Sequence, residues 1–232
     1  MRHIPNFITS LNLASGFAAV IFILNGHPAT ASWLILLAMV FDFFDGFASR
    51  LLKAYSDMGK ELDSLADMVS FGVVPGLLIY SFLCKSGGVN GGEVNFLYLL
   101  VSAFYPVCAG LRLAKFNIDT TQATTFRGMP TPAGALAIIT LSLAAAYSGN
   151  QLINRILESQ TVIIIYSLFL SVMMVTRIPL LSLKFHDLKF KGNEGRFLLI
   201  AAVVLIAALF RFTGLPLIIP AYLLVSVISL LF

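Results

Sequence analysis

The stretch FLLIAAVVLIAALF fills residues 197–210 and lies between Arg196 and Arg211 without one polar side chain. Similar apolar runs recur along the chain and end at Gly, Pro, Asn or charged residues. Hydrophobic residues make up 59% of the 232 residues and charged residues 11%, whereas a soluble domain carries about 25% charged residues. The sequence therefore predicts one integral membrane domain over residues 1–232, with no separate soluble domain.

The apolar runs predict eight transmembrane helices, because each span needs about 20 apolar residues. A helix satisfies its own backbone hydrogen bonds in lipid, and these runs do not alternate as the strands of a barrel do. We therefore expect an all-α, polytopic transmembrane bundle. The expected helices cover residues 8–25, 30–53, 61–83, 95–114, 132–149, 158–179, 196–211 and 215–231.

The basic residues predict the orientation of this bundle. Twelve of the fifteen Lys and Arg residues fall at the N-terminus or in the connections after the second, fourth and sixth helices. Because basic loops stay in the cytoplasm, both termini are expected there, in a multi-pass protein of the cell (inner) membrane. A competing interpretation reads Arg2, the apolar run 13–24 and the small residues 29–31 as a cleavable signal peptide.

Composition also excludes several classes of site. Two cysteines and three widely separated histidines cannot form a disulfide framework or a cysteine- or histidine-based zinc site. The net charge of +4 arises from loop positions, so it indicates membrane topology, and we expect no nucleic-acid partner.

Four acidic residues stand out because they lie within apolar surroundings. Asp42 and Asp45 share one face of the second expected helix, and Asp63 and Asp67 share one face of the third. A short turn makes these helices antiparallel neighbours, so the pairs converge just inside the cytoplasmic interface. A carboxylate at bilayer depth costs about 2.5–3.5 kcal/mol, and clustered oxygen ligands suit Mg²⁺, Mn²⁺ or Ca²⁺. Two ions bridged by shared carboxylates fit this pattern.

Gly46 follows Asp45, and Gly59 precedes Asp63 by four residues. A missing side chain permits either close helix packing or close approach of a ligand. Arg50 offers a planar guanidinium that binds phosphate well. A phosphate-bearing ligand beside the acids is therefore one interpretation, and helix packing is the other.

The pattern Asp42-x2-Asp45-Gly46-x3-Arg50-x8-Gly59-x3-Asp63-x3-Asp67 resembles the signature of the CDP-alcohol phosphotransferases. Ser49 departs from the alanine that is usual there. The resemblance implies a catalytic signature over residues 42–67, a homodimer, and Mg²⁺ or Mn²⁺, as two ions, bound by the four aspartates. It further implies Asp67 as the base. The implied CDP-binding residues are Asn6, Thr9, Gly46, Arg50, Asp57 and Gly59.

A second polar cluster over residues 112–132 comes before the fifth expected helix. It is either a basic anchor for anionic lipid head groups or a pocket for a small charged acceptor. It resembles segments of phosphatidylserine synthases within the family, with Lys115 and Met129 replacing an arginine and a leucine. That resemblance implies CDP-diacylglycerol and L-serine as substrates, with phosphatidylserine and CMP as products. The implied serine-binding residues are Arg112, Lys115, Asn117, Arg127 and Thr131.

Two alternatives remain open at this point. A phosphatidylglycerophosphate or inositol-phosphate synthase of the same family would carry the same aspartates. A cation-coupled transporter also places acids within the membrane, although many such carriers have paired inverted repeats, which this sequence does not show.

Overall fold

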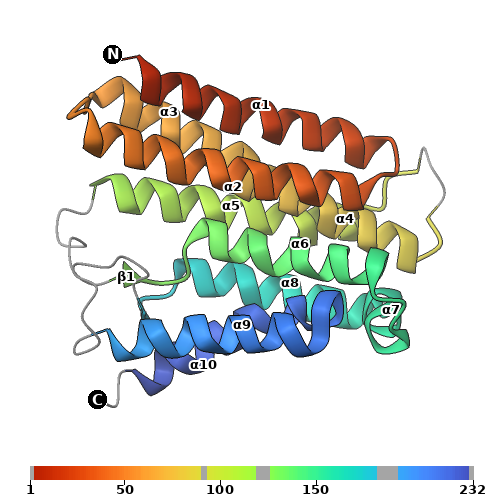
Figure 1. The fold of residues 1–232 in the computed structure, drawn as a ribbon. Coiled ribbons are helices and arrows are strands. Elements are labelled where there is room, and N and C mark those ends of the chain that lie inside the picture. Colours follow the sequence, from red (N-terminus) through yellow and green to blue (C-terminus); the bar gives the residue numbers. More distant parts are fainter. Residues whose placement is uncertain (1–2, 90–92, 119–125, 182–192, 230–232) are drawn as a thin grey trace.

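A computed structural model describes residues 3–89, 93–118, 126–181 and 193–229. Figure 1 shows a bundle of helical rods that run side by side. The helices and strands are α1 (Ile4–Leu24), α2 (Pro28–Leu51), α3 (Asp57–Asp67), the π-helix η1 (Met68–Val73), α4 (Val74–Ser86), α5 (Phe96–Ile118), β1 (Phe126–Arg127), α6 (Thr131–Tyr147), α7 (Gln151–Glu158), α8 (Gln160–Val175), β2 (Pro179–Leu180), α9 (Glu194–Gly214), the 3-10 helix η2 (Leu215–Leu217) and α10 (Ile218–Ile228).

The first two helices form a tight antiparallel hairpin. Gly26 adopts φ +77° between them, a conformation that glycine tolerates at little cost. Pro28 opens α2, where its missing N–H leaves no helical bond unmade. The hairpin thus places the end of α2 beside the beginning of α1, which matters for the site.

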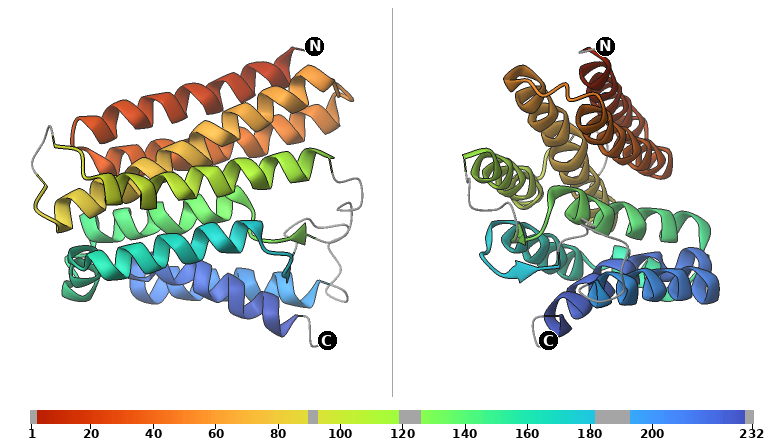
Figure 2. Two further views of the ribbon diagram at one scale, coloured as in Figure 1. Left: turned by 180° about the vertical axis from the view of Figure 1, so that it is seen from behind. Right: turned by 60° about the vertical axis from the view of Figure 1, so that its left-hand side comes forward.

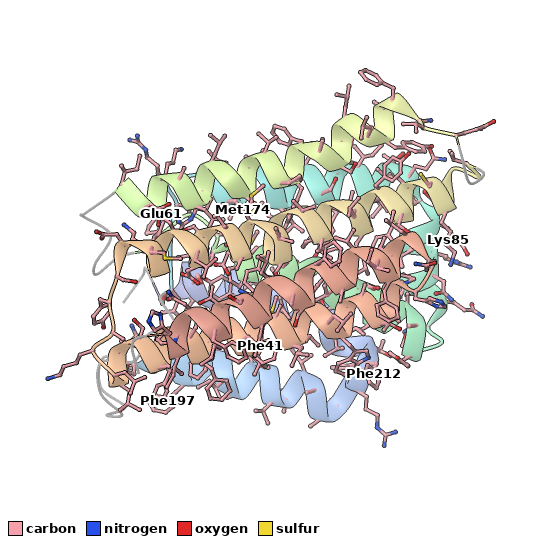
Figure 3. The ribbon with its side chains drawn as sticks, turned by 90° about the horizontal axis from the view of Figure 1, so that it is seen from above. Phe41, Glu61, Lys85, Met174, Phe197 and Phe212 are labelled. Carbon is pink, nitrogen blue, oxygen red and sulfur yellow. The ribbon has the colours of Figure 1, made fainter. Side chains whose placement is uncertain are left out.

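The elements α3, η1 and α4 form one continuous rod over residues 57–86, longer than the expected helix at 61–83. Its 30 residues correspond to about 45 Å of helix. Figure 3 labels Glu61 and Lys85 toward its opposite ends. The rod starts earlier than expected because the Ser56 side chain accepts a hydrogen bond from the Gly59 backbone N–H and caps α3.

The helix expected at 158–179 is present as α8 (Gln160–Val175) and is shorter at both ends. α7 meets α8 at an angle of 83°, and Asn150 caps α7 by accepting a hydrogen bond from the Leu152 N–H. α8 already stops at Val175. The following segment contains β2, which pairs antiparallel with β1 through Phe126 opposite Leu180, two short strands that the sequence did not predict.

The chain turns back near Arg211, whose φ of 48° and ψ of −133° interrupt the helical segment. Phe197 and Phe212 lie toward opposite ends of the bundle (Figure 3), and α10 then returns beside α9 (Figure 2). The helices expected at 196–211 and 215–231 correspond to this pair, with residues 230–231 outside the described residues.

The structure confirms an all-helical bundle with spans suited to a membrane. By length and hydropathy, five of the described helices could cross a bilayer, or six if the bent α7–α8 pair is one span. Residues 194–228 are one segment in this count, and α6, which has 17 residues, is shorter than the helices counted. The eight-span count and the orientation therefore stay predictions.

The apolar core lies where α4, α5, α6 and α8 meet, and it includes Phe71, Leu78, Tyr105, Ile139 and Leu170. Many large apolar side chains on the outside of the bundle are exposed, as expected of a lipid-facing surface. The buried polar residues are therefore the informative exceptions, and several of them gather where α1, α2 and α3 pack together.

Candidate metal and nucleotide site

Three carboxylates from two helices converge in the structure. Asp42 lies on α2, and Asp63 and Asp67 lie one turn apart on α3. Each offers one oxygen atom, and these three atoms lie within 4.8 Å of one another. The predicted convergence of the two acid pairs is thus present for three of the four side chains.

Asp45, the fourth acid, lies one turn beyond Asp42 and is buried. The Thr9 hydroxyl on α1 donates a hydrogen bond of 2.6 Å to its Oδ2. Asp45 stands outside the three-carboxylate group but lines the neighbouring cavity together with Asp63. Asp63 therefore belongs both to the carboxylate group and to the cavity wall.

These residues fit a hard divalent cation. Carboxylate oxygens are the ligands that Mg²⁺ and Mn²⁺ prefer. Within the described part of the chain, the buried Oδ1 of Asp63 has no hydrogen-bond partner, and a buried polar atom normally has one. A cation would satisfy this oxygen and offset the repulsion among three neighbouring carboxylates.

A cavity of about 480 Å³ opens beside the carboxylates, at the ends of α1, α2 and α3. Nine of its thirteen lining residues are polar or charged, and two are glycines from α2 and α3. The lining residues are Pro5, Asn6, Thr9, Asp45, Gly46, Ser49, Ala54, Tyr55, Ser56, Asp57, Gly59, Lys60 and Asp63. Five of the six residues predicted to bind CDP therefore line one cavity.

Arg50 is the exception among those predicted residues. It lies exposed in the last turn of α2 and is not among the residues that line the cavity. Tyr55 and Lys60 do line it, although sequence reasoning did not select them. The sequence offered only their position as a sign of this role, since Tyr55 and Lys60 lie between the two pairs of acids.

The two glycines of the signature have different surroundings. A Cβ on Gly46 would meet nothing within 4 Å, because this residue borders open space. A Cβ on Gly59 would lie 3.0 Å from Asn6 Oδ1 and 3.0 Å from Ser56 Oγ. Gly46 is thus available for a ligand, whereas Gly59 permits close packing of α3 on α1.

The predicted acceptor segment begins inside α5, which continues to Ile118 and so past its expected end at residue 114. Arg112 is buried, and its guanidinium lies 5.4 Å from the centre of the Phe116 ring. Lys115 is exposed. Asn117 is held against α3, since its side-chain amide donates to Ser64 Oγ at 2.8 Å and Lys60 Nζ donates to its backbone carbonyl oxygen at 2.8 Å. These bonds fasten the end of α5 beside the helix that carries Asp63 and Asp67.

The second half of that segment is anchored on α8 and the strand after it. The Gly128 N–H donates to the Ile178 carbonyl, and the Met129 N–H donates to the Met173 carbonyl, both at 2.9 Å. Thr131 is buried at the start of α6. Arg127 belongs to β1, and its side chain lies outside the described residues.

Asn12 on α1 contributes to the site and was not predicted from the sequence. It is fully buried, and its side-chain amide donates to Asp67 Oδ1 at 3.3 Å. The available signal was an asparagine within an apolar helix, because such a side chain needs a polar partner.

Comparison with known proteins identifies the chain's family. The sequence profile of the CDP-alcohol phosphatidyltransferase family matches residues 2–173. The chain is 41% identical over 142 residues to a Bacillus subtilis protein named CDP-diacylglycerol–serine O-phosphatidyltransferase, an alignment that covers 61% of this chain and 76% of that protein. A Mycobacterium leprae protein of the same name is 38% identical over 61% of this chain and 47% of its own length. An archaetidylserine synthase of Methanothermobacter thermautotrophicus is 35% identical over 62% of this chain and 60% of its own length.

Proposed function

Because the chain belongs to the CDP-alcohol phosphatidyltransferase family, we propose that it transfers the phosphatidyl group of CDP-diacylglycerol to the hydroxyl of L-serine. The products are phosphatidylserine and CMP, so the reaction belongs to phospholipid synthesis. The names of the Bacillus and Mycobacterium relatives support serine as the acceptor. The alignments span from about half to three quarters of those relatives.

One observation carries this proposal. Oxygen atoms of Asp42, Asp63 and Asp67 lie within 4.8 Å of one another, and the adjoining cavity of about 480 Å³ is lined by polar groups and by Gly46. Ion-binding carboxylates next to such a cavity suit a substrate that carries a diphosphate, because two negative phosphates need nearby positive charge.

The aspartates divide the chemical work. Asp42, Asp63 and Asp67 would hold one divalent ion, and Asp45, which lies outside their group, would be a further ligand for a second. When bound, Mg²⁺ or Mn²⁺ supplies the positive charge that stabilises the diphosphate and the departing CMP. Gly46, Asn6, Thr9, Asp57 and Gly59 form the CDP-binding wall. Arg50 is close enough in sequence to contribute to it, although it does not line the cavity.

The transfer is a displacement at phosphorus. The serine hydroxyl oxygen forms a bond to the phosphorus that carries the diacylglycerol, and the bond from this phosphorus to the oxygen of the CMP phosphate breaks. The hydroxyl proton passes to the Asp67 carboxylate, which acts as general base. CMP leaves with the bridging oxygen and its electron pair.

The acceptor side of the site is proposed along α5 and the start of α6. Asn117 bonds Ser64 on α3, and Lys60, which lines the cavity, donates to the Asn117 backbone carbonyl, so the end of α5 lies beside the cavity. Arg112, Lys115 and Arg127 offer positive charge for the serine carboxylate, and Asn117 and Thr131 offer hydrogen bonds. This assignment keeps all five predicted serine-binding residues as a proposal.

Topology follows from the charge pattern and the helical rods. We propose eight passes, with α6, α9 and α10 each crossing once and the α7–α8 pair crossing as one span. α1 begins and α10 ends at the same end of the bundle (Figure 1). With the basic connections on the cytoplasmic side, the site lies on the cytoplasmic side of the cell membrane. The chain contacts membrane lipids on its exposed apolar surface and forms a homodimer.

The test is release of CMP by the purified, detergent-solubilised chain. CDP-diacylglycerol is supplied with Mg²⁺ or Mn²⁺ and with serine, glycerol 3-phosphate or inositol 1-phosphate in parallel. Of the three acceptors, we expect only serine to support CMP release, and we expect no CMP release after chelation of the metal. Release with one of the other acceptors and not with serine would move the chain to another branch of the family. No CMP release with any acceptor would favour a carrier.

A further inference from the structure

Helix α1 supplies polar side chains to two of the four aspartates. The Thr9 hydroxyl donates to Asp45, and one turn further along the helix the Asn12 amide donates to Asp67. Both side chains are buried. Two donors on one face of α1 therefore contact one carboxylate on α2 and one on α3.

Packing of α1 against the rod of α3 and η1 also uses contacts that do not involve the Asn12 side chain. The Ser70 hydroxyl donates to the Asn12 backbone carbonyl at 3.2 Å. Gly16 also allows close approach, since a Cβ there would overlap the Ser70 hydroxyl. Since these contacts join the two helices without the Asn12 side chain, its amide can act on the carboxylate.

We propose that Asn12 is a positioning residue for the metal centre: its amide fixes one oxygen of Asp67 and leaves the other oxygen for the cation. The two neighbouring carboxylates repel that of Asp67, and the hydrogen bond from the Asn12 amide opposes its rotation away from them. Such outer groups orient metal ligands, and their loss typically lowers metal affinity or activity about 10- to 100-fold. The inference rests on the metal centre of the proposed function.

The acceptor atom of the same amide points to the same role. Asn12 Oδ1 is buried and has no hydrogen-bond partner within the described part of the chain. A divalent magnesium ion usually keeps several water ligands, each with hydrogens to donate. An asparagine offers both a donor for Asp67 and an acceptor for such a water, which an apolar residue cannot provide.

The experiment compares Asn12→Leu, which keeps a similar size but has no amide, with the control Ser70→Ala. Ser70 is equally buried and donates to the Asn12 backbone carbonyl. Among the hydrogen bonds of the described residues, it makes none to a carboxylate oxygen. For each full-length, detergent-purified variant, thermal stabilisation by Mn²⁺ alone is titrated, and the Mn²⁺ dependence of CMP release is measured separately. We expect the Mn²⁺ midpoint to rise at least about tenfold for Asn12→Leu and to stay within about twofold for Ser70→Ala.

A second variant covers the case in which Asn12→Leu does not fold. Asn12→Ser keeps a polar group but is too short to reach Asp67, and the Mn²⁺ midpoint should rise for it as well. An Mn²⁺ midpoint that matches the wild type in the folded Asn12 variants would overturn the inference. A wild-type chain that is stabilised by Mn²⁺ but releases no CMP would instead contradict the proposed function and leave the role of Asn12 standing.

Discussion

Substitution of Gly46 by alanine separates a glycine kept for a ligand from a glycine kept for packing. Gly46 lies inside α2 and lines the cavity, and a Cβ there would meet nothing within 4 Å. Alanine in a helix interior is more stable than glycine by about 0.5–1 kcal/mol. The variant should therefore be as stable as the wild type or slightly more so, which its thermal unfolding in detergent would show.

Activity should change in the opposite direction. The new methyl group projects into the space where we place the CDP group, and overpacking of this kind costs about 1–3 kcal/mol. That corresponds to a rise of roughly 5- to 150-fold in the KM for CDP-diacylglycerol, measured by CMP release. Gly110→Ala is the matched control. Gly110 lies on α5 and does not line the cavity, and a Cβ there would lie at an ordinary contact distance of 3.5 Å from Met68 Sδ. An unchanged KM for Gly46→Ala would refute the idea that a ligand occupies this space.

Three further substitutions test other parts of the site. Thr9→Val removes the hydrogen bond to Asp45, a bond to a charged group worth about 1.5–3 kcal/mol, so CMP release should fall at least about tenfold, whereas Thr9→Ser should retain most activity. Gly128→Ala should lower the thermal unfolding midpoint strongly, because φ is +79° and the Cβ would lie 2.6 Å from the Thr176 carbonyl oxygen; Gly149→Ala, with φ +62° and nothing within 4 Å, should lower it less. Arg127→Ala should raise the KM for serine more than the KM for CDP-diacylglycerol, and an equal change in both would remove Arg127 from the serine site.

The carboxylate group could be predicted because its geometry is local. Residues three and four apart on a helix share a face, so each pair of acids was readable from spacing alone. The short connection between α2 and α3 then made the two pairs neighbours. The CDP-binding residues were instead implied by the resemblance to the CDP-alcohol phosphotransferases, and the structure places five of the six in one cavity wall.

Helix ends were predicted less well because the apolar signal does not mark them. The start of α3 depends on a single hydrogen bond to Ser56, and the 83° bend between α7 and α8 lies within a stretch that is apolar enough overall to be one span, so hydropathy marks neither. The π-helix η1 is equally invisible in the sequence, although it follows directly after Asp67. Since a π-helical turn contains an extra residue, it shifts the face that α4 presents relative to α3.

The hydrogen bonds from α1 to the aspartates could not be predicted from the spacing of residues in the sequence. Serine and threonine in apolar helices usually bond the carbonyl four residues earlier, as Ser15, Ser32 and Thr140 do here. Thr9 lies within bonding distance of the Pro5 carbonyl as well, at 3.0 Å, so only the packing of α1 on α2 distinguishes it from those residues. Asparagine differs because its amide has two donor hydrogens and an acceptor to satisfy. A buried Asn12 in an apolar helix therefore requires a partner on another helix, and the choice of Asp67 becomes visible only when α1 and α3 are packed together.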